Sequence, residues 1–237
     1  MATSTVKDFL VTHLMPEKCY ERIVVNLHVH VPCLKLISTR IFGFWILLDA
    51  LLAPTAQLLT ILWRRSAEGL SLTSVLLQLY AFSCPVVYAA ANNFPFFAWG
   101  DRLFILAQTA ATVFLILHYR SHTLRGMLVL WAYGGVIFLL VSYAAAAVAS
   151  VMQASSLTAL IASKVLQVRT NHCNGHTGQL ATLSVFLSCT GSLGIFVSLQ
   201  ETESLFTTLS HALSAGLSFV LLVQVLCSSG TTRAKCE

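Results

Sequence analysis

Seven apolar runs of membrane-spanning length follow one another along the chain, separated by short polar breaks. A helix needs about 20 apolar residues to cross the hydrocarbon core of a bilayer. Because backbone N–H and C=O groups in lipid must bond within their own segment, each run is expected to be a helix. The pattern predicts spans over residues 41–62, 72–91, 103–119, 127–147, 151–168, 180–199 and 205–227.

Composition agrees with an all-α integral membrane protein. The 237 residues are 57% hydrophobic and only 10% charged, whereas soluble domains carry about 25% charged residues. The net charge of +5 is scattered over the ends of the apolar runs. That placement suits lipid headgroups, so we expect the lipid bilayer as a partner and no nucleic acid. The seven cysteines form no CxxC pair, and we interpret them as small apolar fillers rather than a disulfide framework.

Basic residues near the span ends predict the orientation of the chain. One set of span ends carries most of them: Arg64, Arg65, Arg120, Arg125, Arg169, Arg233 and Lys235. Lys and Arg are enriched on the cytoplasmic side of membrane proteins. The distribution therefore predicts a cytosolic C-terminus and an N-terminus in the lumen or exterior.

An internal repeat relates the two ends of the chain. Gln57 and Gln167 lie 110 positions apart, and the same offset relates Ser74 to Ser184. Each unit has a span ending near Gln, a short loop with Gly, and a second span that opens with Ser or Thr. We predict two parallel three-helix repeats joined by a linker helix. The expected division is an N-terminal lumenal or interfacial segment (1–40), a first repeat (41–119), a linker helix (127–147), a second repeat (151–227) and a cytosolic tail (228–237).

Short motifs give the chain a family resemblance. They are PEKCY at 16–20, HVPCLK at 30–35, RSAEGLSL at 65–72, NNFPF at 92–96, HYR at 118–120 and NGHTGQL at 174–180. Together they resemble the PQ-loop repeat proteins, which share a SWEET-like transporter fold, and within them the branch concerned with mannose-P-dolichol utilization. There is one departure. The first repeat of the family normally carries Pro-Gln, whereas here Gln57 follows Ala56 and the nearest proline is Pro54.

The resemblance implies a multi-pass endoplasmic reticulum membrane protein. It would be required for the use of dolichol-phosphate-mannose and dolichol-phosphate-glucose in N-glycan, GPI-anchor and O- and C-mannose synthesis, by presenting or reorienting the lipid-linked sugar. Dolichol-phosphate-sugars are then the expected ligands, and lumenal glycosyltransferases are candidate partners. The alternative is an alternating-access transporter of a small polar solute, a sugar or an amino acid, although few polar residues are expected near the midplane. A membrane enzyme ranks last, because the nine acidic residues are scattered.

Three residues within the apolar runs are candidate binding residues. Asp49 lies nine residues after Arg40, well inside the first span, and an ionisable group in lipid is a functional hypothesis by default. Lys164 is a candidate partner, although its side chain could also snorkel to the cytoplasmic interface. Gln57 and Gln167 either hold helices together or line a central path at equivalent depth in each repeat.

Polar residues at the span ends complete the candidate set. Asn92 and Asn93 could hydrogen-bond a sugar, but turn formation explains them equally well. Arg120 belongs to a basic patch that could attract a lipid phosphate or anchor the protein at anionic headgroups. Glu68 and Asn171, in or beside the two duplicated loops, are included as candidate binding residues.

The stretch NHCNGHTGQL offers three metal-ligand side chains within five positions, at His172, Cys173 and His176. A structural zinc site needs about four protein ligands. No second ligand pair occurs in a matching loop, and the corresponding loop of the first repeat, RRSAEGLS, contains no zinc-ligand side chain of the His or Cys type. We therefore expect a helix–loop–helix connector with a turn at Asn174-Gly175, and no metal or cofactor.

Overall fold

The protein is a bundle of long helices. The computed structural model describes residues 11, 15–26, 30–199 and 205–234, and contains no strand within them. The long helices are α3 (Val31–Arg64), α4 (Leu72–Ala91), α5 (Gly100–Tyr119), α6 (Thr123–Tyr143), α7 (Ala146–Asn174), α8 (Thr182–Leu199) and α9 (Leu205–Ala234). Three short elements accompany them: α2 (Glu17–Tyr20), the π-helix η1 (Glu21–Val25) and the 3₁₀-helix η2 (Phe96–Ala98). The all-helical fold predicted from the sequence is confirmed.

Six helices among the described residues are long and apolar enough to cross a membrane, and a shorter apolar stretch lies in α8 (Thr182–Leu193). α4 has the predicted bounds, but α3 begins ten residues before the predicted span. The predicted linker span ended too late, because Ala144 and Ala145 adopt extended backbone and separate α6 from α7. Two predicted features lie outside the described residues: the loop around Glu201, and Lys235 near the C-terminus. Part of the predicted N-terminal segment lies outside them as well.

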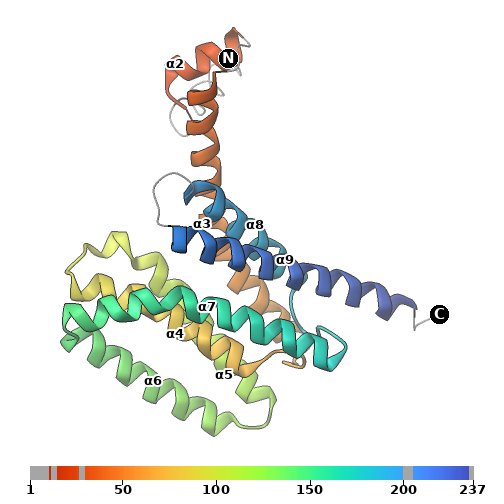
Figure 1. Cartoon of the computed structure of the whole chain (residues 1–237). Helices are drawn as coiled ribbons and strands as arrows, with labels where there is room; N and C mark the ends of the chain where they lie inside the picture. Colours follow the sequence, from red (N-terminus) through yellow and green to blue (C-terminus); the bar gives the residue numbers. More distant parts are fainter. Residues whose placement is uncertain (1–10, 12–14, 27–29, 200–204, 235–237) are drawn as a thin grey trace, which may run out of the picture.

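The helices form two groups with the same internal packing. In the first group α5 packs against both α3 and α4, and in the second α9 packs against both α7 and α8. Across the boundary between the groups, α3 packs against α8 and α4 against α7. α6 lies on the outside of the bundle, against α4 and α5 (Figure 1). The first helix of each group therefore contacts the second helix of the other group.

The outside of the bundle is apolar, as expected of a surface that faces lipid. On α6, Trp131 is 81% exposed and Phe138 is 69% exposed, while the only buried residue of the helix is Gly126. In water such a face would be unfavourable, but lipid tails solvate it without cost. The multi-pass arrangement therefore implies contact with a bilayer.

A disulfide corrects our interpretation of the cysteines. Cys19 of α2 is bonded to Cys33 of α3, with Cα atoms 5.5 Å apart. Met15, Tyr20 and Ile37 pack around the bond. The two cysteines are 14 residues apart and form no CxxC motif, so no local pattern marked them as a pair. Cys84, Cys173, Cys189 and Cys227 form no disulfide within the described part of the chain.

The disulfide lies on a part of the molecule that projects from the bundle. α3 has 34 residues, about 51 Å at 1.5 Å per residue, and is thus longer than the hydrocarbon core of about 30 Å. Its N-terminal turns and α2 extend beyond the other helices (Figure 1). We call this the disulfide end, and the opposite end, where residues 65–71 and 175–181 connect helices, the loop end.

Candidate functional site

The two connecting loops at the loop end touch each other through two glycines. A Cβ built on Gly69 would lie 2.8 Å from the Cα of Gly178, and a Cβ on Gly178 would overlap the carbonyl of Glu68. Both glycines have positive φ, +81° and +54°, a region that other residues rarely occupy. The backbone N–H of Gln179 donates to the Glu68 carbonyl at 2.9 Å. Glycine at both positions is therefore what allows the loops to cross.

The two glutamines of the duplicated anchors tie each helix group to the loop of the other. Gln57 donates from Nε2 to the carbonyl of Gln179 at 3.0 Å and accepts from the N–H of Ala181 at 2.9 Å. Gln167 donates from Nε2 to the carbonyl of Gly69 at 3.0 Å and accepts from the N–H of Ser71 at 3.1 Å.

Every partner in this exchange is offset by the same 110 positions that separate the glutamines. Both side chains are buried, at 9% and 5% exposure. Their amides replace water as partners of loop backbone groups that would otherwise be unsatisfied. Gln57 and Gln167 thus hold the two groups together at the loop end.

A polar network continues from Gln167 along α7. The Nε2 atom of Gln167 also donates to Oδ1 of Asn171 at 2.8 Å, and Nδ2 of Asn171 donates to Oε1 of Gln224 at 3.0 Å. Gln224 closes the network by donating to the carbonyl of Val168 at 3.2 Å. Asn171 is therefore a buried structural residue that joins α7 to α9.

We predict that Gln57→Leu and Gln167→Leu each lower the free energy of unfolding by about 2–6 kcal/mol. Each change leaves one buried carbonyl and one buried N–H without a partner, at about 1–3 kcal/mol per group. Thermal unfolding of purified protein in detergent measures the effect. Gln78→Leu is the matched control, because Gln78 is a half-buried α4 residue for which the described residues provide no hydrogen-bond partner. The interpretation fails if the two variants unfold no earlier than the control.

A second polar site lies deep within the bundle, around Lys164 of α7. Its Nζ donates to the hydroxyls of Ser192 at 3.1 Å, Ser214 at 2.8 Å and Ser218 at 2.6 Å. It also approaches the Ser214 carbonyl at 3.2 Å. Our alternative expectation, that Lys164 snorkels to the interface, is wrong, because these hydroxyls of α8 and α9 hold the ammonium group inside the bundle.

Asp49 approaches the same region from the other helix group. Its carboxylate lies against Gly191, where a Cβ would overlap it. One turn before it on α3, Trp45 donates from Nε1 to the hydroxyl of Thr190 at 2.8 Å. The Oδ1 atom of Asp49 is buried and has no hydrogen-bond partner among the described residues. Asp49 and Lys164 interact electrostatically, but no ion pair within 4 Å joins these two described residues.

We name this site the intramembrane polar cluster: Asp49, Lys164, Ser192, Ser214 and Ser218. Asp49 lies fifteen residues before the end of α3, and Lys164 lies ten before the end of α7. These separations correspond to about 22 Å and 15 Å along the helices. The cluster therefore lies within the span-forming part of the bundle, where Asp49 of α3 meets the second helix group.

The remaining candidates serve local structure. Asn92 is the C-cap of α4, and its Nδ2 donates to the Tyr88 carbonyl at 2.8 Å. Asn93 has a positive φ of 53° in the turn that follows. Arg120 donates from its guanidinium to the Leu70 carbonyl at 2.6 Å. The side chain of Glu68 is exposed, and only its backbone takes part in the loop crossing.

The potential metal ligands of NHCNGHTGQL do not converge. Cys173 and His176 are exposed, and α7 continues to Asn174, where Gly175 ends it in the left-handed conformation at φ 69°. Within the described residues no group of three His, Cys, Asp or Glu could hold a metal ion. The stretch is the turn between α7 and α8.

Comparison with known proteins finds a family match over part of this chain. Residues 34–98 match the PQ loop repeat family. The match includes α3 from Leu34 onward, the loop with Gly69, and α4, and thus Asp49 and Gln57. No solved structure matches the chain.

Proposed function

We propose that the protein is a non-enzymatic endoplasmic reticulum membrane protein required for the use of dolichol-phosphate-mannose and dolichol-phosphate-glucose. These donors supply sugars to N-glycans, GPI anchors and O- and C-mannosylated proteins. Its role is to present or reorient the lipid-linked sugar for lumenal glycosyltransferases. The motifs from PEKCY at 16–20 to NGHTGQL at 174–180 resemble the mannose-P-dolichol utilization defect 1 protein, and this resemblance identifies the donor class.

The intramembrane polar cluster is the observation that carries this proposal. A lipid-linked sugar has a polar headgroup that cannot cross hydrocarbon unaided, because each unsatisfied polar group there costs several kcal/mol. Asp49 and Lys164 supply opposite charges at mid-depth on different helix groups, with three serine hydroxyls beside them. Such groups can satisfy sugar hydroxyls and phosphate oxygens while the isoprenoid tail stays in lipid.

The disulfide supports the proposed orientation. Disulfides form and persist in oxidising compartments such as the endoplasmic reticulum lumen. The Cys19–Cys33 bond lies at the disulfide end, while Arg64, Arg65 and Arg169 lie at the loop end. Both features favour a lumenal disulfide end and a cytosolic loop end.

Complementation tests the function. Cells that lack the mannose-P-dolichol utilization defect 1 protein would be transfected with this chain, and their lipid-linked oligosaccharides profiled. We expect the chain to restore full-length oligosaccharides, with surface GPI-anchored protein as a second readout. Unchanged truncated oligosaccharides in cells that express the protein at the membrane would reject the proposal.

The same cluster also favours a second function, alternating-access transport of a small polar solute such as a sugar or an amino acid. Transporters bind solutes near the midplane, at the boundary between repeats, and the cluster lies at such a boundary. Vesicles containing the purified protein would then show solute-dependent flux, which the presentation of a lipid does not require.

A further inference from the structure

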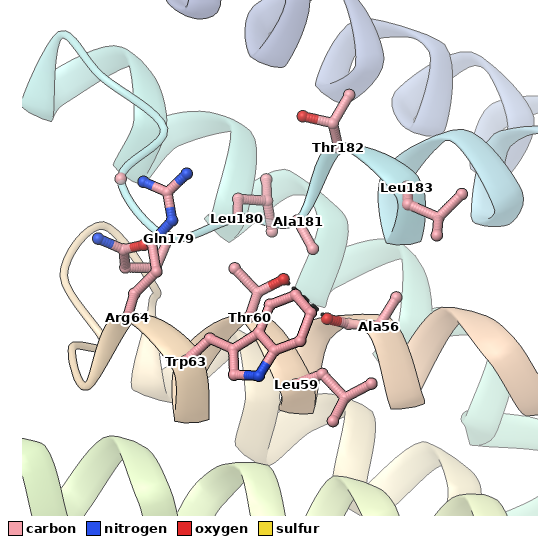
Figure 2. Close-up of a pocket in the computed structure, with 11 residues that line it drawn as sticks. Ala56, Leu59, Thr60, Trp63, Arg64, Gln179, Leu180, Ala181, Thr182 and Leu183 are labelled. Carbon is pink, nitrogen blue, oxygen red and sulfur yellow. Dashed lines mark hydrogen bonds between the residues drawn. The ribbon is translucent and has the colours of Figure 1, made fainter.

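A cavity of about 310 Å³ lies at the loop end, between the last turns of α3 and the start of α8. Figure 2 shows its lining, with Thr60, Trp63 and Arg64 from α3 on one side and residues 178–183 on the other. It is distinct from the intramembrane polar cluster, because none of the cluster residues lines it.

The chemistry of the cavity wall changes with depth. Ala56, Leu59 and Leu183 give it an apolar floor, and Arg64 and Gln179 give it a polar mouth. No hydrogen bond or ion pair occupies the Arg64 guanidinium among the described residues, so it is available to an anion. The Oε1 atom of Gln179 is buried and, within the described residues, has no hydrogen-bond donor. The site therefore offers a cation, an unsatisfied acceptor and an apolar wall.

Trp63 places this mouth at the membrane surface. Its side chain is 87% exposed, and Trp at the end of a spanning helix lies at the level of lipid headgroups. Leu59, one turn deeper, is 45% exposed to the surrounding lipid. A lipid lying against α3 would thus have its headgroup beside Arg64 and its chain beside Leu59.

We propose that this cavity binds the phosphate-sugar headgroup of a polyisoprenyl-phosphate-linked sugar, with the isoprenoid chain in lipid. Arg64 pairs with the phosphate, and the Gln179 oxygen accepts a hydrogen bond from a sugar hydroxyl. A lipid whose headgroup has no hydrogen-bond donor, such as a phosphocholine lipid, would satisfy Arg64 alone, whereas a phosphate-linked sugar also supplies the donor that the Gln179 oxygen lacks. The inference rests on the proposed function and names where its substrate docks.

The corresponding positions of the second repeat do not offer this chemistry. Trp63 and Arg64 correspond, 110 positions later, to Cys173 and Asn174. Neither side chain can provide a cation or an aromatic anchor. A docking site built on this pair of residues exists only in the first repeat, so the two halves of the bundle would play different roles toward the ligand.

Equilibrium binding to the full chain in nanodiscs tests the site. Radiolabelled citronellyl-phosphoryl-mannose is the probe, with citronellol, mannose 1-phosphate and inorganic phosphate as competitors. Because charge-assisted hydrogen bonds are among the strongest in proteins, we expect Arg64→Gln to weaken probe binding about tenfold or more. Arg169→Gln removes the same charge from an exposed α7 position and should leave binding unchanged. Ala56→Leu should weaken binding by filling the cavity, with Ala154→Leu on exposed α7 as its control.

Each outcome has a defined meaning. Equal binding by wild type and Arg64→Gln overturns the site. Equally tight binding of mannose 1-phosphate or inorganic phosphate overturns the lipid assignment, because the isoprenoid chain would then contribute nothing. If wild type restores glycosylation in the complementation assay but a photoreactive probe labels residues far from this cavity, the docking site is wrong while the proposed function stands. If wild type binds the probe here but fails to complement, the proposed function alone fails.

Discussion

Gly178→Ala is expected to prevent the two loops from crossing and to destabilise the protein by more than about 4 kcal/mol, a size that single substitutions rarely reach. A methyl group at this position overlaps the Glu68 carbonyl, which is backbone and cannot rotate away. Separating the loops would break the hydrogen bond from Gln179 to Glu68 at 2.9 Å and disturb the exchange made by Gln57 and Gln167. One steric overlap would thus disturb the hydrogen bonds of both loops at the loop end.

Gly175→Ala is a matched control for this variant. Gly175 also has a positive φ, +69°, but a Cβ there meets nothing within 4 Å. It therefore carries only the cost of the left-handed conformation, about 1–2 kcal/mol. Heating each variant in detergent and recording the remaining monodisperse fraction by size-exclusion chromatography compares the two. Similar midpoints for Gly178→Ala and Gly175→Ala would show that the loops do not pack as described.

The spans were predictable because bilayer thickness sets a length that an apolar run must match. The 22-residue run at 41–62 marked a membrane segment, but the helix itself begins at Val31. Hydropathy reports where lipid begins, whereas Pro32, at the first turn of α3, and the disulfide to Cys33 fix where the helix starts. Element bounds outside the membrane therefore need information that hydropathy does not contain.

The anchors of the loop end were found from the sequence, but their partners were not. Gln57 and Gln167 stood out because a 110-position offset repeats around them. Their hydrogen bonds are made with backbone groups of the opposite loop. Every residue type has these backbone groups, so the sequence cannot indicate which of them are the partners. The contact between Gly69 and Gly178 is likewise a tertiary fact, since each glycine alone reads as an ordinary turn residue.

The intramembrane polar cluster was only half visible in the sequence. Asp49 was recognisable because ionisable residues are rare in apolar runs. Ser192, Ser214 and Ser218 were not, because isolated serines in spanning helices usually bond to their own backbone. Two of them do so, Ser192 to Ser188 and Ser218 to Ser214, and all three also accept from Lys164. Only the fold shows that all three serine hydroxyls accept hydrogen bonds from the same ammonium group.

Lys164→Met is expected to abolish complementation, and the combination with Asp49→Asn separates this loss from instability. Removing Lys164 alone takes away the opposite charge that interacts with Asp49, so we expect this single variant to be less stable than wild type. The double variant Asp49→Asn with Lys164→Met removes both charges. Ser192 and Ser218 keep their bonds to Ser188 and Ser214, so we expect its thermal stability to equal or exceed that of wild type.

Complementation should nevertheless stay absent in the double variant, because neither charge remains to meet a headgroup at mid-depth. Arg169→Met is the control, since it removes a charge from an exposed position on the same helix and should affect neither measurement. Restored complementation in the double variant would make the two charges a structural pair. Equal melting temperatures for Lys164→Met and the double variant would show that Asp49 gains nothing from Lys164. A stable double variant that cannot complement is the result that distinguishes a functional cluster from a structural one, because loss of stability would then not explain the loss of function.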